Sequence, residues 1–151
     1  MKDYLKIKEK LFEECVQFNK TKCDTINKSI ASNKNDLLSE TKSSAGDKHE
    51  TGRAMIQLEM EKASQQFYEL KKMKEVLDKI DIEKSSELAC LGSIIKTTKG
   101  DYFLAISVGQ VIIENEIYFV VSPQSPIGSH LLGKKAGDDI PFNNSIILEI
   151  A

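Results

Sequence analysis

The sequence lacks several features that would place it in a well-defined class. It has no tryptophan, three prolines and three cysteines among 151 residues. No stretch approaches the roughly 18–20 apolar residues that a helix needs to cross a bilayer, and the first ten residues are charged, unlike a secretory signal. Cys15, Cys23 and Cys90 are an odd number without zinc-site spacing, which favours buried, reduced thiols. These absences favour a cytoplasmic protein that does not contact the membrane.

A basic excess is also missing. Lys and Arg number 16 against 16 Asp and Glu over residues 1–83, and 5 against 7 over residues 84–151. A protein that binds duplex DNA by itself normally carries a basic stripe that neutralises phosphates. We therefore expect any contact with nucleic acid to be local and guided by a protein partner.

Residues 1–83 contain no proline and repeat apolar side chains at the alternating four- and three-residue spacing of a coiled-coil seam. Residues 39–46 are small and polar, which predicts a turn between two helices of roughly 30–38 residues each. Such helices are expected to fold back as an antiparallel hairpin, although periodicity alone fits a dimerising coiled coil equally well. The seams comprise Leu5, Phe12, Val16, Cys23, Ile26, Ile30 and Leu37, then Ile56, Met60, Ala63, Phe67, Leu70, Met73, Leu77 and Ile80.

Residues 84–151 show a different pattern, with short β-branched or aromatic runs separated by turn residues. A short helix is expected at Ser129–Leu132, closed by Gly133. The chain is therefore predicted to be α+β: a long antiparallel helical hairpin over residues 1–83, then a small antiparallel β domain with one short helix over residues 84–151. The expected strands are 93–97, 102–107, 110–113, 117–121 and 145–150.

Two carboxylates mark the start of the expected second helix, so the hairpin has an acidic tip near residues 39–50. Asp47 and Glu50 are three residues apart and would share one side of a helix. Mg²⁺ prefers carboxylate oxygens and commonly takes only one or two from a protein, so this pair would be a partial metal site that a partner completes. The alternative is a capping box, with Asp47 at the N-cap and both acidic groups near the positive end of the helix.

The remaining candidates for chemistry are weak. Cys90 lies in an apolar run without a nearby histidine, and His49 is expected to be a solvated surface residue. The pairs Lys134–Lys135 and Asp138–Asp139 are most simply a solvated turn. The sequence shows no nucleophile–base constellation, no Gly-rich phosphate loop and no metal site complete in itself. We therefore expect that the protein is not an independent enzyme.

Two segments together resemble the Gre family of bacterial transcript-cleavage elongation factors. Residues 121–139 read Val-Ser-Pro-Gln-Ser-Pro-Ile-Gly-Ser-His-Leu-Leu-Gly-Lys-Lys-Ala-Gly-Asp-Asp. This segment is similar to the Ser-Pro-Ile…Leu-Ile-Gly-Lys…Gly-Asp signature of the family's C-terminal domain, which implies an FKBP-like fold. Gly46-Asp47-x-x-Glu50 is similar to the Gly-Asp-x-x-Glu at the tip of the family's coiled coil.

The resemblance implies a specific activity. The hairpin would enter the secondary channel of bacterial RNA polymerase, where Asp47 and Glu50 would help to hold a Mg²⁺ ion shared with the polymerase. They would also orient a water that cleaves a backtracked transcript near its 3′ end. The cleavage activity itself would be intrinsic to the polymerase. The protein would act as a monomer. The positions that would dock at the channel rim are Ser125, Pro126, Ile127, Gly133 and Lys134.

The tip also departs from the family pattern. Family members usually continue Glu-Asn-x-x-Tyr, whereas Glu50 is followed by Thr51, Gly52 and Arg53. Gly52 weakens a helix by roughly 0.5–1 kcal/mol relative to alanine. Two alternative functions therefore remain open: a Gre-like regulator that occupies the channel without stimulating cleavage, and a coiled-coil adaptor protein.

Overall fold

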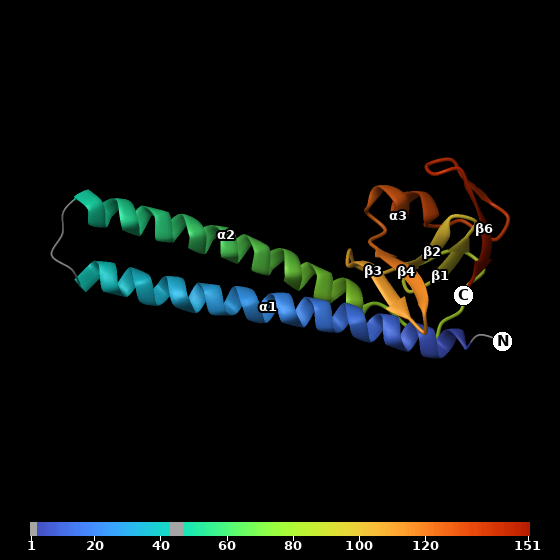
Figure 1. Ribbon diagram of the computed structural model, residues 1–151, viewed down its shortest axis with the longest axis horizontal. Coiled ribbons are helices and arrows are strands. Elements are labelled where there is room, and N and C mark those ends of the chain that lie inside the picture. Colours follow the sequence, from blue (N-terminus) through green and yellow to red (C-terminus); the bar gives the residue numbers. More distant parts are fainter. Residues whose placement is uncertain (1–2, 43–46) are drawn as a thin grey trace. The chain divides into compact units, whose positions relative to one another are not determined.

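The computed structural model describes the backbone of residues 3–42 and 47–151, and their side chains except those of residues 37, 40–42 and 47–51. In these ranges the element order is two long helices, four strands, a short helix and two strands, which confirms the α+β prediction (Figure 1). The chain divides into two compact units. One comprises Met1–Phe18 with Glu75–Ala151, and the other comprises Asn19–Lys74.

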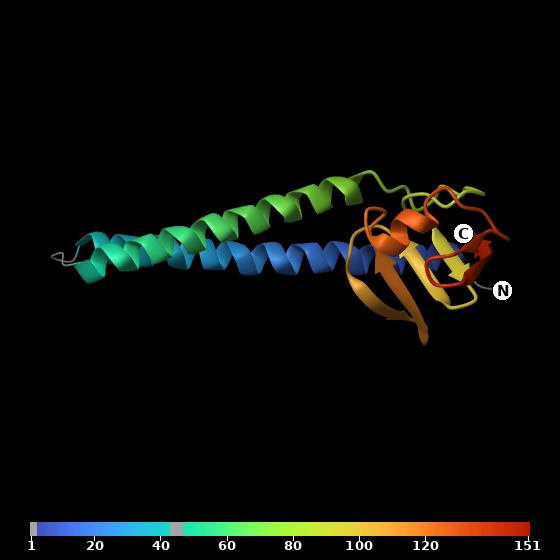
Figure 2. The same cartoon turned by 90° about the horizontal axis from the view of Figure 1, so that it is seen from above.

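The unit Asn19–Lys74 is an antiparallel helical hairpin. Helix α1 spans Tyr4–Lys42 and helix α2 spans Asp47–Asp78, and the two lie side by side along this unit (Figure 2). The lack of proline allows both helices to continue without interruption. The predicted seam is confirmed in this unit, because its described members are all buried or half-buried: Cys23, Ile26, Ile30, Ile56, Met60, Ala63, Phe67, Leu70 and Met73.

Two asparagines occupy the same seam and are buried. Asn19 is 5% exposed and Asn33 is 8% exposed. The Asn19 side-chain amide donates to the Leu70 carbonyl at 2.8 Å and its oxygen accepts from the Cys23 thiol at 3.7 Å. A buried amide is costly without partners, and a polar residue in a coiled-coil seam selects one register. The Asn19–Leu70 bond therefore specifies how the two helices align.

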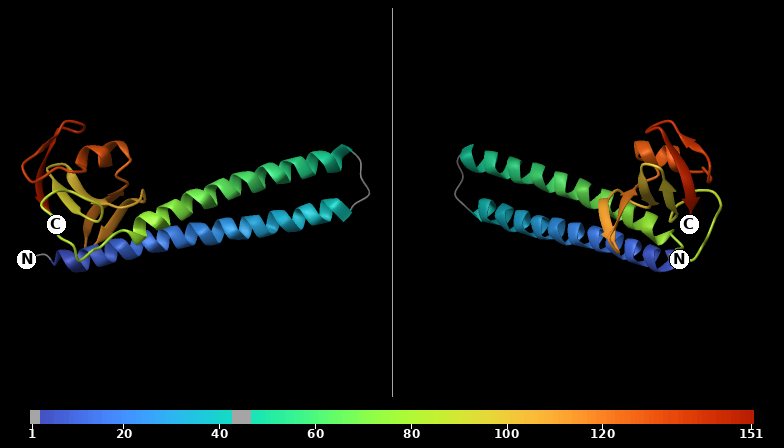
Figure 3. Two further views of the ribbon diagram at one scale, coloured as in Figure 1. Left: turned by 180° about the vertical axis from the view of Figure 1, so that it is seen from behind. Right: turned by 45° about the vertical axis from the view of Figure 1, so that its right-hand side comes forward.

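The other unit contains a six-stranded sheet in the described residues, with the order β3-β4-β2-β1-β6-β5. Figure 3 shows the ribbon of this unit from two further sides. Five strands match the predicted runs within a few residues, while the two-residue strand β5 was not predicted. The strands are β1 Ile94–Thr97, β2 Gly100–Leu104, β3 Gly109–Ile113, β4 Glu116–Val121, β5 Asp139–Ile140 and β6 Ser145–Ile150.

The prediction of a wholly antiparallel sheet is wrong for one pair, because β2 and β4 run parallel. Strands β3 and β4 form a hairpin whose turn residues, Glu114 and Asn115, have φ values of 52° and 66°. This hairpin places β4 beside β2 and leaves β3 at the edge. Tyr118 and Val120 of β4 are almost fully buried, whereas Ile112 of β3 is 65% exposed. The more apolar strand therefore takes the interior position.

Helix α3, Pro126–Leu131, lies over one face of the sheet (Figure 1). It begins three residues earlier than the helix expected at Ser129–Leu132, because Ser125 acts as its N-cap and Pro126 fits the first turn. The core beneath it combines residues of α3, the sheet and the segment before β1. Its buried members are Ala89, Ile95, Leu104, Leu131, Ile140 and Ile147.

The first turns of α1 belong to the same unit as the sheet. They bury Ile7, Leu11 and Cys15, which recur every four residues. Polar contacts add to this packing: the Tyr4 hydroxyl donates to the Glu149 carboxylate at 2.8 Å, and Lys10 pairs with Glu114 at 3.1 Å.

The predicted seam is wrong in this part of α1. Leu5 and Val16 are each 43% exposed, because the buried face of the helix is set by Ile7, Leu11 and Cys15 instead. In the part of the chain that the structure describes, none of the helices is long and apolar enough to cross a membrane.

The three thiols differ in burial, which gives a testable expectation. Cys15 is fully buried, whereas Cys23 and Cys90 are half-buried, and all three are free. Burial raises the pKa of the Cys15 thiol to about 12, so it stays protonated at neutral pH. Iodoacetamide at pH 8 should therefore modify Cys23 and Cys90 well before Cys15, as read by peptide mass spectrometry. Equal labelling of the three in the folded chain would contradict this packing of α1.

Candidate functional site

The predicted acidic pair falls at the start of α2. The helix begins at Asp47, so the backbone of Asp47 and Glu50 lies in its first turn. Their side chains lie outside the described residues. Helical geometry places residues three apart on the same side, and two carboxylates one turn apart fit the donor chemistry of a partial Mg²⁺ site. The same position also fits a capping role, because the positive end of a helix favours acidic groups.

Among the side chains that the structure describes, no group of three or more His, Cys, Asp or Glu is placed to hold a metal ion. The side chains of Asp47 and Glu50 lie outside that description. Two carboxylates fill only part of the ligand shell of Mg²⁺, which commonly keeps water and phosphate at its other positions.

The C-terminal motif forms the N-terminus of α3. The Ser125 hydroxyl accepts from the Gly128 amide at 3.1 Å and donates to the Ser122 carbonyl at 2.6 Å. Pro126 occupies the first turn, where a missing amide hydrogen has no cost. Ile127 is half-buried against the core. Each of these three residues therefore has a structural role in the fold, while the partner-binding role implied by the resemblance stays a prediction.

Gly133 and Lys134 form the turn after α3. Gly133 has a φ of 81°, a conformation that favours glycine, and its amide donates to the Ala89 carbonyl at 2.8 Å. The Ala89 amide in turn donates to the Lys134 carbonyl at 2.7 Å. This pair of bonds fastens the end of α3 to the segment before β1. The structure thus brings all five predicted docking positions together on α3 and its flanking turns.

An exposed aromatic and apolar group beside α3 was not predicted. The rings of His130 and Phe142 stack with centroids 5.2 Å apart, and Phe142 is 54% exposed. Leu132, two residues after His130, is 47% exposed. The sequence gives little indication of this contact, because Phe142 lies in a turn outside α3 and no periodicity relates it to His130.

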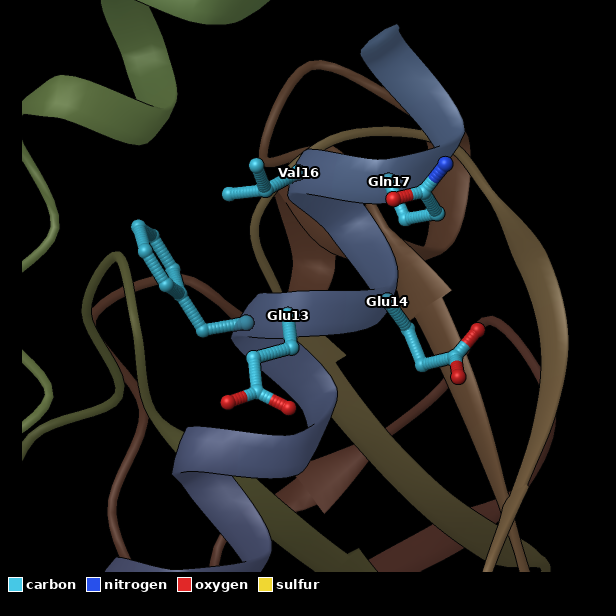
Figure 4. Close-up of a pocket in the computed structure, with 5 residues that line it drawn as sticks. Glu13, Glu14, Val16 and Gln17 are labelled. Atoms are coloured by element: carbon cyan, nitrogen blue, oxygen red, sulfur yellow. The ribbon is translucent and has the colours of Figure 1, made fainter. Parts of the chain in front are cut away.

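A second surface feature lies on the first part of α1. A hollow of about 580 Å³ is lined by Phe12, Glu13, Glu14, Val16 and Gln17. Figure 4 shows Val16 on one side of the helix, Glu14 and Gln17 on the other, and Glu13 between them. The lining therefore combines apolar, acidic and amide groups.

The cap of α3 gives a prediction for the docking motif. Ser125→Ala removes the acceptor for the Gly128 amide and should destabilise the sheet-bearing unit by about 1 kcal/mol. Urea denaturation followed by circular dichroism measures this loss. Ser129→Ala is the matched control, because this exposed hydroxyl only bonds the Pro126 carbonyl within the helix and its loss should cost less. Equal losses would argue against Ser125 as the cap.

Comparison with protein-family models, with curated proteins and with solved structures gave no match to this chain. Its function is therefore argued from its own residues and their arrangement.

Proposed function

We propose that the chain is a Gre-type transcription elongation factor. It binds bacterial RNA polymerase in the cytoplasm as a monomer, with its hairpin in the secondary channel. There it stimulates Mg²⁺-dependent cleavage of backtracked transcripts near the 3′ end. The sheet-bearing unit would be an FKBP-like docking domain. The protein would not be an enzyme by itself, since the cleavage activity belongs to the polymerase.

The observation that carries this proposal is the start of α2 at Asp47. The backbone of Asp47 and Glu50 therefore lies in the first turn of the second helix of the hairpin. A helical hairpin with its acidic groups at the reversal can deliver them into a narrow channel. The α+β order of elements and the position of the C-terminal motif on α3 give further support.

The chemistry at the tip follows from two carboxylates in the same helical turn. A Mg²⁺ ion shared with the polymerase would supply charge stabilisation for the displacement. Asp47 and Glu50 would provide part of its ligand shell and would accept hydrogen bonds from the attacking water. Their fixed spacing on a helix would lower the entropic cost of placing both groups at once.

The direct test is RNA release from a stalled, backtracked elongation complex of the cognate polymerase, with and without the protein, across a Mg²⁺ titration. The proposal expects faster, Mg²⁺-dependent appearance of short 3′ fragments when the protein is added. Release at an unchanged rate, with the protein bound to the polymerase, would reject the cleavage function.

A second candidate is a regulator that occupies the same channel without stimulating cleavage. The observation that favours it is Thr51-Gly52-Arg53, which replaces the family's usual continuation after Glu50. Glycine in the second turn of α2 lowers helix stability there, so the carboxylates would be held less firmly. Binding with inhibition of RNA synthesis and without cleavage would select this function. A coiled-coil adaptor would instead fail to bind polymerase and would show twice the chain mass in solution.

A further inference from the structure

The two buried asparagines of the helical hairpin differ in their partners. The side-chain amide of Asn19 donates to the Leu70 carbonyl of the facing helix at 2.8 Å. Asn33 is only 8% exposed, yet its side chain forms no hydrogen bond with the residues that the structure describes. None of the described side-chain nitrogen or oxygen atoms is both buried and without a partner, so the Asn33 amide reaches solvent at the edge of the seam. Asn33 therefore occupies a seam position without linking the two helices.

The register of the hairpin places this second asparagine opposite an apolar residue. Asn33 lies two heptads after Asn19 in α1, and Ile56 lies two heptads before Leu70 in α2. Because the helices are antiparallel and the Asn19–Leu70 bond sets their register, Asn33 and Ile56 occupy facing positions of the seam. An amide opposite an isoleucine provides neither a hydrogen bond between the helices nor a fully apolar pair.

The position of Asn33 divides the hairpin into two parts. The stem, residues 19–30 and 60–74, contains the side-chain hydrogen bond between the helices. The arm, residues 33–39 and 52–56, contains the seam asparagine that has no partner among the described residues. The free energy of local opening depends on the apolar contacts and hydrogen bonds within each part.

Apolar burial also differs between the stem and the arm. In the stem, Ala63 and Leu70 are 6% and 4% exposed. No apolar side chain that the structure describes in the arm is buried to that extent, and Leu38 and Met55 are 58% and 61% exposed. Gly52 adds no side chain to the seam and lowers helix stability around it. The arm therefore has fewer of the interactions that oppose opening.

From the unlinked asparagine and the uneven burial together, we propose that the arm opens and closes as a unit while the stem stays packed. In the open state the two helical segments of the arm separate and unwind as far as Asn33. A partner that encloses the closed arm adds contacts to that state alone and therefore shifts the population toward it. The inference concerns the free chain, so it stands or falls separately from the proposed cleavage function.

Amide hydrogen exchange of the full ¹⁵N-labelled chain, followed by NMR, tests whether the arm opens by itself. Protection factors in the arm should be at least about 100-fold lower than those of residues 23–30 and 60–67 in the stem. Protection that is uniform from the stem through the arm would overturn the proposal.

A substitution in the seam separates this opening from ordinary fraying of helix ends. Asn33→Leu places an apolar side chain opposite Ile56 and should raise protection of the arm by about tenfold or more. Asn35→Leu is the matched control, because Asn35 is an exposed asparagine in the same segment and gives the same gain in helix propensity. This control should change protection of the arm by no more than about twofold.

The two substitutions together decide the role of Asn33. Equal gains from both, or no gain from Asn33→Leu, would show that the seam at Asn33 does not control opening, and would reject the proposal. Sedimentation of each variant checks that the added leucine has not caused association.

Discussion

Replacing Asp47 and Glu50 together with alanine should abolish stimulation of transcript cleavage while leaving polymerase binding intact. If the two carboxylates complete a metal site in the transition state, their removal should forfeit several kcal/mol of stabilisation. At about 1.4 kcal/mol for each tenfold change in rate, cleavage should slow by about 100-fold or more. Quantifying 3′ fragments from a backtracked complex at saturating protein measures this change directly.

Competition for polymerase between the variant and the wild-type chain provides the binding control. Glu61→Ala is the matched substitution, because Glu61 is an exposed glutamate on the same helix, away from its first turn. The capping interpretation predicts a different result. If Asp47 and Glu50 only stabilise the start of α2, the double variant would lose about 1 kcal/mol of helix stability and retain stimulation. Measuring the cleavage rate and the melting curve on the same samples separates the two roles.

Gly128→Ala should be among the most destabilising single substitutions in the sheet-bearing unit. A Cβ atom at this position would meet the Ser122 carbonyl oxygen far inside van der Waals contact, and would lie 2.8 Å from the Ser125 hydroxyl oxygen. Both atoms belong to the cap of α3, so neither can move without breaking the bonds that start the helix. We expect a loss of about 3 kcal/mol, measured as a shift of the denaturation midpoint in urea.

Gly133→Ala is the informative comparison for that prediction. Its φ of 81° strains any other residue, yet nothing lies within 4 Å of the added carbon. Backbone strain alone should cost about 1–2 kcal/mol. If Gly128→Ala lowers the free energy of unfolding by no more than Gly133→Ala does, the Ser122 carbonyl does not lie in close contact with Gly128.

The helical half of the fold could be predicted because one pattern dominates it. Every member of the predicted seam in α2 is buried or half-buried, from Ile56 to Leu77. The pattern failed at Leu5 and Val16, because periodicity reports that a helix has an apolar stripe and does not say which neighbour covers it. In α1 two stripes overlap, and Ile7, Leu11 and Cys15 form the one that is buried.

The sheet was predicted strand by strand but not in its order. Runs such as Ile117–Val121 are evident locally, whereas the parallel pairing of β2 with β4 joins strands that are not consecutive in the chain, and no local pattern predicts it. The two residues of β5 are too few to form a pattern. Helix α3 begins three residues before its predicted start, because Ser125 caps it and Pro126 fits its first turn.

The candidate site also contains residues that could be predicted from the sequence and a contact that could not. Asp47 and Glu50 were predicted from their spacing and lie in the first turn of α2, but their shared metal ion remains a prediction. Ser125, Pro126, Ile127, Gly133 and Lys134 were identified through a sequence motif, and the structure shows what that motif does within the fold. The stack of His130 on Phe142 joins residues that no local rule relates.

The strand order has a consequence for how the chain folds during synthesis. Strand β1 finds β2 immediately after it, but its other neighbour, β6, is the last strand to leave the ribosome. Until then one side of β1 has unpaired backbone groups, and the core beneath α3 lacks Ile140 and Ile147. Non-local pairing of this kind is slow and exposes a nascent chain to aggregation. Both helices of the hairpin precede the strands in the chain, so the hairpin can form before the sheet is complete.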